Sequence, residues 1–279
     1  MQISSTLKIP NLQNIAIDVE NGAIAILKLN RPTALNALNP SRLLDLNNGL
    51  QWAEAESAIR VIILTGEGRN FTAGLDLLDK DVKAADSTVS DKFVDALSAV
   101  QESLINTNKV LITAVKGPSP GWGTSSLALS DLVYSTPDAY FFTPFVKWGL
   151  CAEASASQAL ARIMGRQKAS SLILAGARFS ARDLEAAGLI TQILDRDGFM
   201  DSVLLVAKSI LESPAEALTT NKKLMMIGTR ELLLETNRRE MIEFRRLARG
   251  KECRDAVAAF GRRQDEKNKK KKQGVSSKL

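Results

Sequence analysis

Two short, uniformly apolar segments constrain the fold of this chain most. Residues 61–65 read Val-Ile-Ile-Leu-Thr, and residues 110–115 read Val-Leu-Ile-Thr-Ala-Val. Each has the length of a strand buried on both faces, which is typical of parallel sheets. Each runs into a glycine-containing loop and then into a helical pattern, over residues 91–106 and 124–129 respectively. Strand–loop–helix units of this kind predict an α/β fold.

The two ends of the chain differ from this middle part. Residues 14–20 and 23–29 have strand patterns on either side of Asn21-Gly22, a hairpin turn signal. Beyond residue 155 the pattern is almost wholly helical, with helices expected over residues 200–211, 214–227, 230–249 and 252–263. We therefore expect an α/β body with a helical C-terminal region.

The net charge of +6 is concentrated in the last part of the sequence. Residues 267–279 hold six lysines and no acid, and the rest of the chain carries 31 basic and 31 acidic residues. A terminal block of like charges is usually solvated, so residues 266–279 are expected to form a basic flexible tail. No nucleic-acid partner is expected for the neutral body. The apolar runs are too short to predict a membrane span.

The chain contains no histidine. This excludes Ser-His-Asp and Cys-His catalysis and every histidine metal site. The two cysteines, Cys151 and Cys253, form no metal-binding pattern, so neither a metal nor a cofactor is expected. Acid–base chemistry must come from Asp, Glu, Lys, Tyr or Cys.

Two glycine loops are candidates for anion or oxyanion binding. They are Ala73-Gly74 and Gly121-Trp122-Gly123, and each lies between a strand and a helix. Glycine allows the backbone to approach a ligand closely, and free N–H groups at such a place stabilise a polarised oxygen. From these residues alone, an ordinary turn remains the alternative for each loop.

Four ordered segments together resemble the crotonase family of enoyl-CoA hydratases and isomerases. The first is Leu29-Asn-Arg-Pro32 with Leu35-Asn-Ala-Leu38, and the second is Asn70-Phe-Thr-Ala-Gly-Leu-Asp-Leu77. The third runs from Gly117 to Gly123 and is followed by Ser130-Asp131, and the fourth is Phe179 to Ile190. The resemblance implies a spiral of repeated β–β–α units over residues 10–206. It also implies a helical trimerisation region over residues 207–265, ahead of the tail.

The resemblance further implies an acyl-CoA thioester substrate, with CoA as part of the substrate, and a homotrimer or hexamer. Two backbone N–H groups, those of Ala73 and Trp122, are expected to bind the thioester oxygen. Residues expected to contact the acyl-CoA are Ala73, Gly74, Leu75, Asp76, Leu77, Leu35, Gly121 and Phe145.

The reaction is inferred from the carboxylates. Hydratases of this family use two glutamates, and Ser125 and Phe145 occupy the corresponding positions here. The segment from Gly149 to Glu153 resembles that of the Δ3,Δ2-enoyl-CoA isomerases, closest to the peroxisomal ones, in which the glutamate is the base. Glu153 is therefore the expected catalytic residue of an enoyl-CoA isomerase in the oxidation of unsaturated fatty acids. Read without the resemblance, Glu153 is an acid at a helix N-terminus.

Three alternatives remain open at this point. A dienoyl-CoA isomerase would need a second acid where Phe145 stands. A specialised biosynthetic enzyme, including a hydratase-like one, is compatible with Trp122 in place of the family's usual glycine. A non-catalytic binding protein of the same fold would use its basic tail for RNA or an anionic membrane.

The chain ends in Ser277-Lys278-Leu279, the tripeptide of a peroxisomal address. We expect a peroxisomal location and an import receptor as partner.

Overall fold

The centre of the protein is a six-stranded sheet with the order β1-β2-β3-β4-β6-β9. The computed structural model describes residues 7–85 and 87–276. Strands β2 (Ile24–Leu29), β3 (Val61–Gly66), β4 (Val110–Val115), β6 (Leu132–Ser135) and β9 (Gln192–Ile193) run parallel, and β1 (Ile15–Glu20) pairs antiparallel with β2. Every residue of β3 and β4 is buried, as their uniform apolar character predicts.

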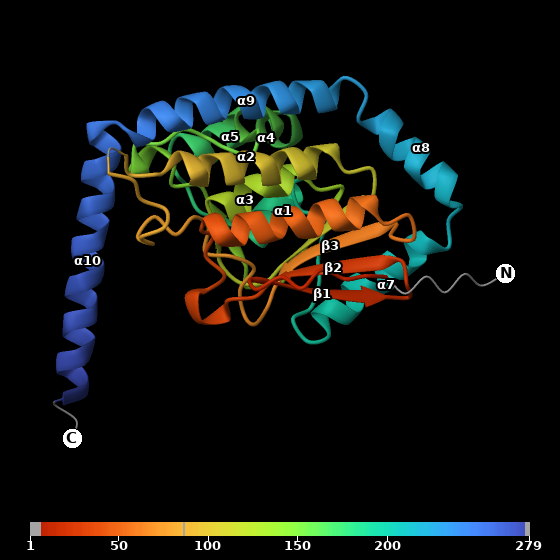
Figure 1. Ribbon diagram of the computed structural model, residues 1–279, viewed down its shortest axis with the longest axis horizontal. Helices are drawn as coiled ribbons and strands as arrows, with labels where there is room; N and C mark the ends of the chain where they lie inside the picture. Colours follow the sequence, from red (N-terminus) through yellow and green to blue (C-terminus); the bar gives the residue numbers. More distant parts are fainter. Residues whose placement is uncertain (1–6, 86, 277–279) are drawn as a thin grey trace.

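Helices cover both faces of this sheet. Helices α1 (Pro40–Ala55) and α2 (Asp91–Asn106) pack against each other over one face, and α7 (Phe199–Leu211) packs on the other (Figure 1). The side chains of Asn39 and Ser90 cap α1 and α2 by accepting backbone N–H bonds in their first turns. The mixed α/β class expected from the sequence is confirmed.

A second, three-stranded sheet lies beside the first. It consists of β5 (Ser119–Pro120), β7 (Tyr140–Phe142) and β8 (Phe179–Ser180), in the order β5-β7-β8. Around it lie the short helices α3 (Trp122–Ser125), α4 (Ala156–Met164), α5 (Arg166–Ile173) and α6 (Ala181–Ala186), and the 3-10 turns η2 (Ser126–Leu129) and η3 (Val146–Trp148). A further 3-10 turn, η1 (Pro32–Ala34), follows β2.

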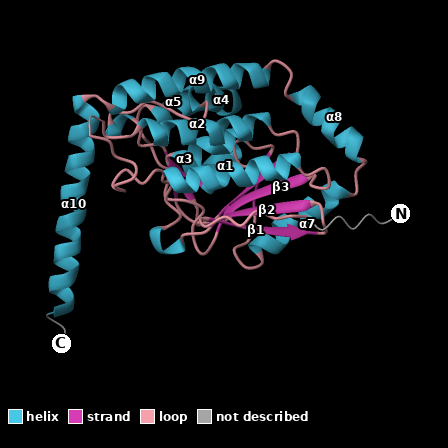
Figure 2. Cartoon of the chain, in the orientation of Figure 1, coloured by secondary structure: helices cyan, strands magenta, loops and turns pink. Residues whose placement is uncertain are grey.

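Three helices complete the chain. Helix α8 (Ala215–Met225) leads to α9 (Thr229–Ala248), which contacts α2 and α4, and α10 (Lys251–Ser276) then runs down one side of the molecule (Figures 1 and 2). No helix in the described part of the chain is both long and apolar enough to cross a bilayer.

Two expected boundaries differ from the structure. The boundary at residue 206 falls inside α7, because Phe199, Val203 and Ala207 of that helix form one apolar cluster with the sheet. The segment expected to be flexible from residue 266 is instead part of α10 as far as Ser276. Lys, Arg, Glu, Gln and Ala dominate this helix, and all are strong helix formers. Ser277, Lys278 and Leu279 lie outside the described residues.

Candidate active site

A cavity of about 370 Å³ lies where the loops after β3 and β4 meet the C-terminal helices. Its walls are mainly aromatic and aliphatic, and the only carboxylates among them are Asp76 and Glu153. The lining residues come from most of the chain: Ala37, Ala73, Gly74, Leu75, Asp76, Leu77, Leu78, Pro120, Gly121, Trp122, Phe142, Pro144, Phe145, Trp148, Leu150, Glu153, Phe244 and Phe260. Such a cavity suits an apolar ligand with one reactive polar group.

The two glycine loops predicted from the sequence meet at this cavity. A Cβ added to Gly74 would lie 2.7 Å from the carbonyl oxygen of Pro120 and 3.8 Å from the amide nitrogen of Trp122. Gly74 also has a φ of +78°, a conformation that L side chains rarely adopt. Glycine at this position therefore allows the two loops to touch.

The backbone N–H groups of these loops differ in their hydrogen bonds. The N–H of Ala73 donates to the carbonyl of Leu35 at 2.8 Å, and the N–H of Gly74 donates to Thr72 Oγ1 at 3.1 Å. The N–H groups of Leu75 and Trp122 have no acceptor among the described residues. The expectation for Ala73 is thus corrected, because its donor is already used, and the donor available in this loop belongs to Leu75.

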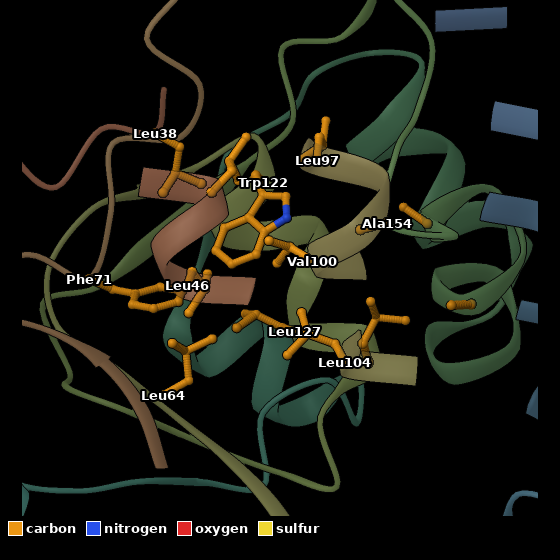
Figure 3. Packing of buried hydrophobic residues seen from close by; sticks show 14 of the residues in the cluster. Leu38, Leu46, Leu64, Phe71, Leu97, Val100, Leu104, Trp122, Leu127 and Ala154 are labelled. Atoms are coloured by element: carbon orange, nitrogen blue, oxygen red, sulfur yellow. The ribbon is translucent and has the colours of Figure 1, made fainter. Parts of the chain in front are cut away.

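The side chain of Trp122 is fully buried and packs against Phe71, with the ring centroids 6.2 Å apart. Figure 3 shows the indole within the apolar cluster that also holds Leu46 and Val100. The ring therefore fills the core behind the cavity, and the backbone N–H of the same residue, at the start of α3, has no acceptor in the part of the chain that the structure describes.

The other predicted contact residues divide into two groups. Gly74, Leu75, Asp76, Leu77, Gly121 and Phe145 all line the cavity, as does Ala73. Leu35 does not line it: its side chain is 46% exposed, and its contribution is the carbonyl that accepts from Ala73. Leu35 has a left-handed backbone conformation, with a φ of +51°.

Glu153 is fully buried at the wall of the cavity. Its Oε1 accepts a hydrogen bond from Ser125 Oγ, and its Oε2 accepts one from Gln101 Nε2 at 2.7 Å. Burial raises the pKa of Glu153 to about 8, the charge of Glu240 adds to this rise, and the two hydrogen bonds oppose it. A carboxylate with this pKa is poised to take up and return a proton near neutral pH.

The segment after Glu153 has an unusual backbone conformation. Ala154 and Ser155 both have a φ of +58°, which costs a non-glycine residue about 1–2 kcal/mol. The N-terminus of α4 is covered by Glu240 of α9, whose carboxylate accepts from the N–H groups of Ser155 and Ser157 at 2.7 and 2.9 Å. Glu240, and not Glu153, is therefore the acid at this helix N-terminus.

Sequence reasoning did not single out Gln101 or Glu240 for the site. Gln101 is fully buried and lies on α2 among Leu97, Val100 and Leu104, so a polar residue on an apolar helix face was the available signal. Glu240 lies on a helix rich in Glu and Arg, and its spacing offers no comparable signal.

Comparison with known proteins identifies the family of this chain. The family described as enoyl-CoA hydratase/isomerase matches residues 19–271. The chain belongs to this family. It is an enzyme of the enoyl-CoA hydratase/isomerase family, and a thioester of CoA is the substrate consistent with that membership.

The relatives of this chain include a protein named as a hydratase and one named as an isomerase. The 2,3-dehydroadipyl-CoA hydratase of Escherichia coli is 30% identical over 237 residues, covering 85% of this chain and 91% of the relative. The enoyl-CoA delta isomerase 2 of Rattus norvegicus is 28% identical over 240 residues, or 86% of this chain. The testis-specific chromodomain protein Y 2 of Homo sapiens is 27% identical over 237 residues, or 84% of this chain. The chain spans 61% of the length of the rat protein and 44% of the human one.

A solved structure supports the same membership. The enoyl-CoA hydratase/isomerase from Pseudoalteromonas atlantica T6c superimposes with a TM-score of 0.82 at 27% identity, covering 90% of this chain and 98% of that one. The crotonase-type fold predicted from the sequence is confirmed.

Proposed function

We propose that this enzyme is an enoyl-CoA isomerase that moves a double bond from C3 to C2 of an acyl-CoA, with Glu153 as the only proton carrier. The observation that carries the proposal is the arrangement of Glu153. It is a buried carboxylate with a raised pKa in an apolar cavity, and the same cavity is lined by Leu75 and Trp122, whose backbone N–H groups have no acceptor among the described residues.

The first step takes a proton from C2. The Glu153 carboxylate accepts this proton, and the electron pair of the C2–H bond is delocalised onto the thioester oxygen as an enolate. The N–H groups of Leu75 and Trp122 are the proposed donors to that oxygen, since both lack other acceptors in the described residues. Removal of one such donor typically costs about 3–4 kcal/mol of transition-state stabilisation.

The second step returns the same proton to C4. The double bond then lies between C2 and C3, and Glu153 is again a carboxylate. No other acid or base is required. The second carboxylate of the cavity belongs to Asp76 on the first glycine loop, and the backbone N–H of this residue donates to the Leu38 carbonyl.

Two residues argue against addition of water. Hydratases are expected to use glutamates at the positions of Ser125 and Phe145. Here the Ser125 hydroxyl is engaged with Glu153, and Phe145 adds a nearly buried apolar ring to the cavity wall. The same ring argues against a dienoyl-CoA isomerase, which would need an acid there.

The test is product identification with 3-enoyl-CoA and 2-enoyl-CoA substrates. The proposal expects the 3-enoyl ester to become the 2-enoyl ester, and Glu153→Gln to lose about 10²–10⁴-fold in kcat while still binding CoA esters. The exposed Glu231→Gln serves as the control and keeps normal turnover. Formation of 3-hydroxyacyl-CoA as the main product would contradict the proposal, and binding without turnover by the wild type would favour the non-catalytic alternative.

The homotrimeric or hexameric assembly, the peroxisomal location and the import receptor stay predictions.

A further inference from the structure

The mechanism above leaves one buried carboxylate without a role. Glu240 of α9 is only 7% exposed, and both of its carboxylate oxygens accept hydrogen bonds from backbone N–H groups. The two donors, Ser155 and Ser157, belong to the segment that leaves Glu153 and enters α4. A residue of the C-terminal helical region therefore contacts the backbone immediately next to the proposed base.

This segment has a conformation that requires support. Ala154 and Ser155 are consecutive left-handed residues, and neither is glycine. Ser155 Oγ donates to the carbonyl of Leu233, also on α9, and so ties the same residue to that helix a second time. On the other side of Glu153, the Cys151 thiol lies 3.5 Å from the carbonyl oxygen of Glu240. Helix α9 thus contacts the chain on both sides of Glu153.

We propose that Glu240 is a positioning residue for Glu153: by accepting from the N–H groups of Ser155 and Ser157, it holds the left-handed pair Ala154–Ser155 that directs the Glu153 side chain into the cavity. The kinetic part of this proposal rests on the proposed isomerase function. The structural part does not, because it concerns the backbone conformation alone.

The chemistry of the contact requires a carboxylate. Two N–H donors point at one side chain, and an ionised carboxylate offers an acceptor oxygen to each of them. A glutamine offers one oxygen and places an NH₂ group against the other donor, so one of the two N–H groups loses its acceptor. Glu240→Gln is therefore a nearly isosteric change that removes half of the contact.

Glu240 also acts on the proton affinity of the site. The titratable groups near it are Glu153 and Cys151, and its negative charge raises the pKa of both. Glu240→Gln removes that charge, so the pKa of Glu153 falls. The acid limb of the kcat/KM profile then moves to lower pH, an effect that a merely structural residue would not produce.

The experiment compares three full-length variants with the wild type on a 3-enoyl-CoA. Glu240→Gln is expected to lower kcat at least tenfold with KM changed less than twofold, and to shift the acid limb to lower pH. Glu231→Gln, a charge removal on the exposed face of the same helix, is the matched control with wild-type kinetics. The double variant Ala154→Gly/Glu240→Gln is expected to recover much of the lost kcat, because glycine adopts the left-handed conformation without support.

A second readout does not depend on turnover. Hydrogen exchange of the Ser155 and Ser157 amides is expected to become at least tenfold faster in Glu240→Gln and to stay unchanged in Glu231→Gln. Unchanged exchange together with unchanged kcat in a folded Glu240→Gln protein would overturn the proposal. If that variant does not fold, Glu240→Asp, which keeps the charge but shortens the reach, is expected to show the same loss of kcat, and wild-type kinetics there would overturn it.

The two proposals fail in different ways. A wild type that does not isomerise 3-enoyl-CoA contradicts the proposed function, and amide exchange then decides the role of Glu240 by itself. An active wild type with normal kinetics and normal exchange in Glu240→Gln contradicts only the positioning role.

Discussion

Gln101 and Glu153 are 52 positions apart in the chain and are joined by a 2.7 Å hydrogen bond in which the carboxamide nitrogen donates to Oε2. With Ser125 on Oε1, both carboxylate oxygens are held from different elements, α2 and α3. Each donor favours the charged form of Glu153, and burial favours the neutral form more strongly.

Gln101→Leu keeps the volume of the side chain and removes the donor. The pKa of Glu153 is then expected to rise further, because a hydrogen bond to a charged group contributes about 1.5–3 kcal/mol. This corresponds to a shift of the acid limb of kcat/KM by about one to two pH units upward, since one pKa unit is about 1.4 kcal/mol. The exposed Gln51→Leu on α1 is the control, and an acid limb unchanged by Gln101→Leu would refute the role of this bond.

The wild-type pH dependence follows from the same carboxyl group. Glu153 must be ionised to accept the C2 proton, and its pKa is about 8. We expect kcat/KM to rise about tenfold per pH unit below that pKa and to level off above it. A pH–rate series on a 3-enoyl-CoA measures this, and a profile that is flat from pH 5 to 9 would show that another group is the base.

Stability should depend on pH in the opposite direction. In the unfolded chain a glutamate has a pKa of about 4.3, well below the folded value for Glu153 of about 8. Below both values the group is protonated in both states and has no effect. As pH rises between them, the unfolded state ionises first, so the free energy of unfolding falls, and above both values the loss is complete.

Glu153→Gln removes this titration. As pH rises from 5 to 9, the wild type is expected to lose on the order of a few kcal/mol in the free energy of unfolding that the variant keeps. Urea unfolding of both proteins at the two pH values measures the difference. An equal pH dependence in the two proteins would mean that Glu153 has an ordinary pKa.

Gly74 and Gly165 form a matched pair for the contact between the two loops. Both have a φ of +78°, but an added Cβ meets the Pro120 carbonyl oxygen at 2.7 Å in the first and nothing within 4 Å in the second. Gly165→Ala is expected to cost about 1–3 kcal/mol in stability, because its φ of +78° and ψ of 150° favour glycine, and to leave activity unchanged. Gly74→Ala should cost more and lower kcat/KM at least 100-fold, because it separates the loops that carry Leu75 and Trp122. Equal effects in thermal unfolding and in kinetics would contradict this use of Gly74.

The cavity lining also predicts acyl specificity. Its only charged side chains are the carboxylates of Asp76 and Glu153, and none of the lining residues is Lys or Arg. An acyl chain that ends in a carboxylate would lose its hydration without gaining a partner. We expect kcat/KM for 3-hexenoyl-CoA to exceed that for 3-hexenedioyl-CoA at least 100-fold, in contrast to the dicarboxylic substrate named for the Escherichia coli relative. Comparable values would place the acyl end outside this cavity.

Strands and helices with a clear hydrophobic pattern can be predicted from the sequence. The expected strands at residues 61–65 and 110–115 and the expected helix at residues 91–106 match β3, β4 and α2 within one residue. The second sheet was missed, because two-residue strands such as β5 and β8 have no periodicity to detect.

The candidate site shows a similar division. Family motifs mark Glu153 and the two glycine loops in the sequence, and Glu153 and residues of both loops line one cavity in the structure. The Ala73 donor was misassigned, because no side-chain pattern tells which backbone N–H is already bonded, here to Leu35. Gln101 and Glu240 come from distant elements, and their contacts with the site arise only from the packing of α2 and α9.

The cavity wall includes Ala37 near one end of the chain and Phe260 near the other, the latter packed edge-on against Trp148 at 4.8 Å. Chains are synthesised from the N-terminus, so the residues of β1 to β6 and of both glycine loops leave the ribosome long before those of α10. Until α10 has packed against Trp148, the wall of the cavity lacks Phe260. The last helix to be synthesised therefore completes the cavity.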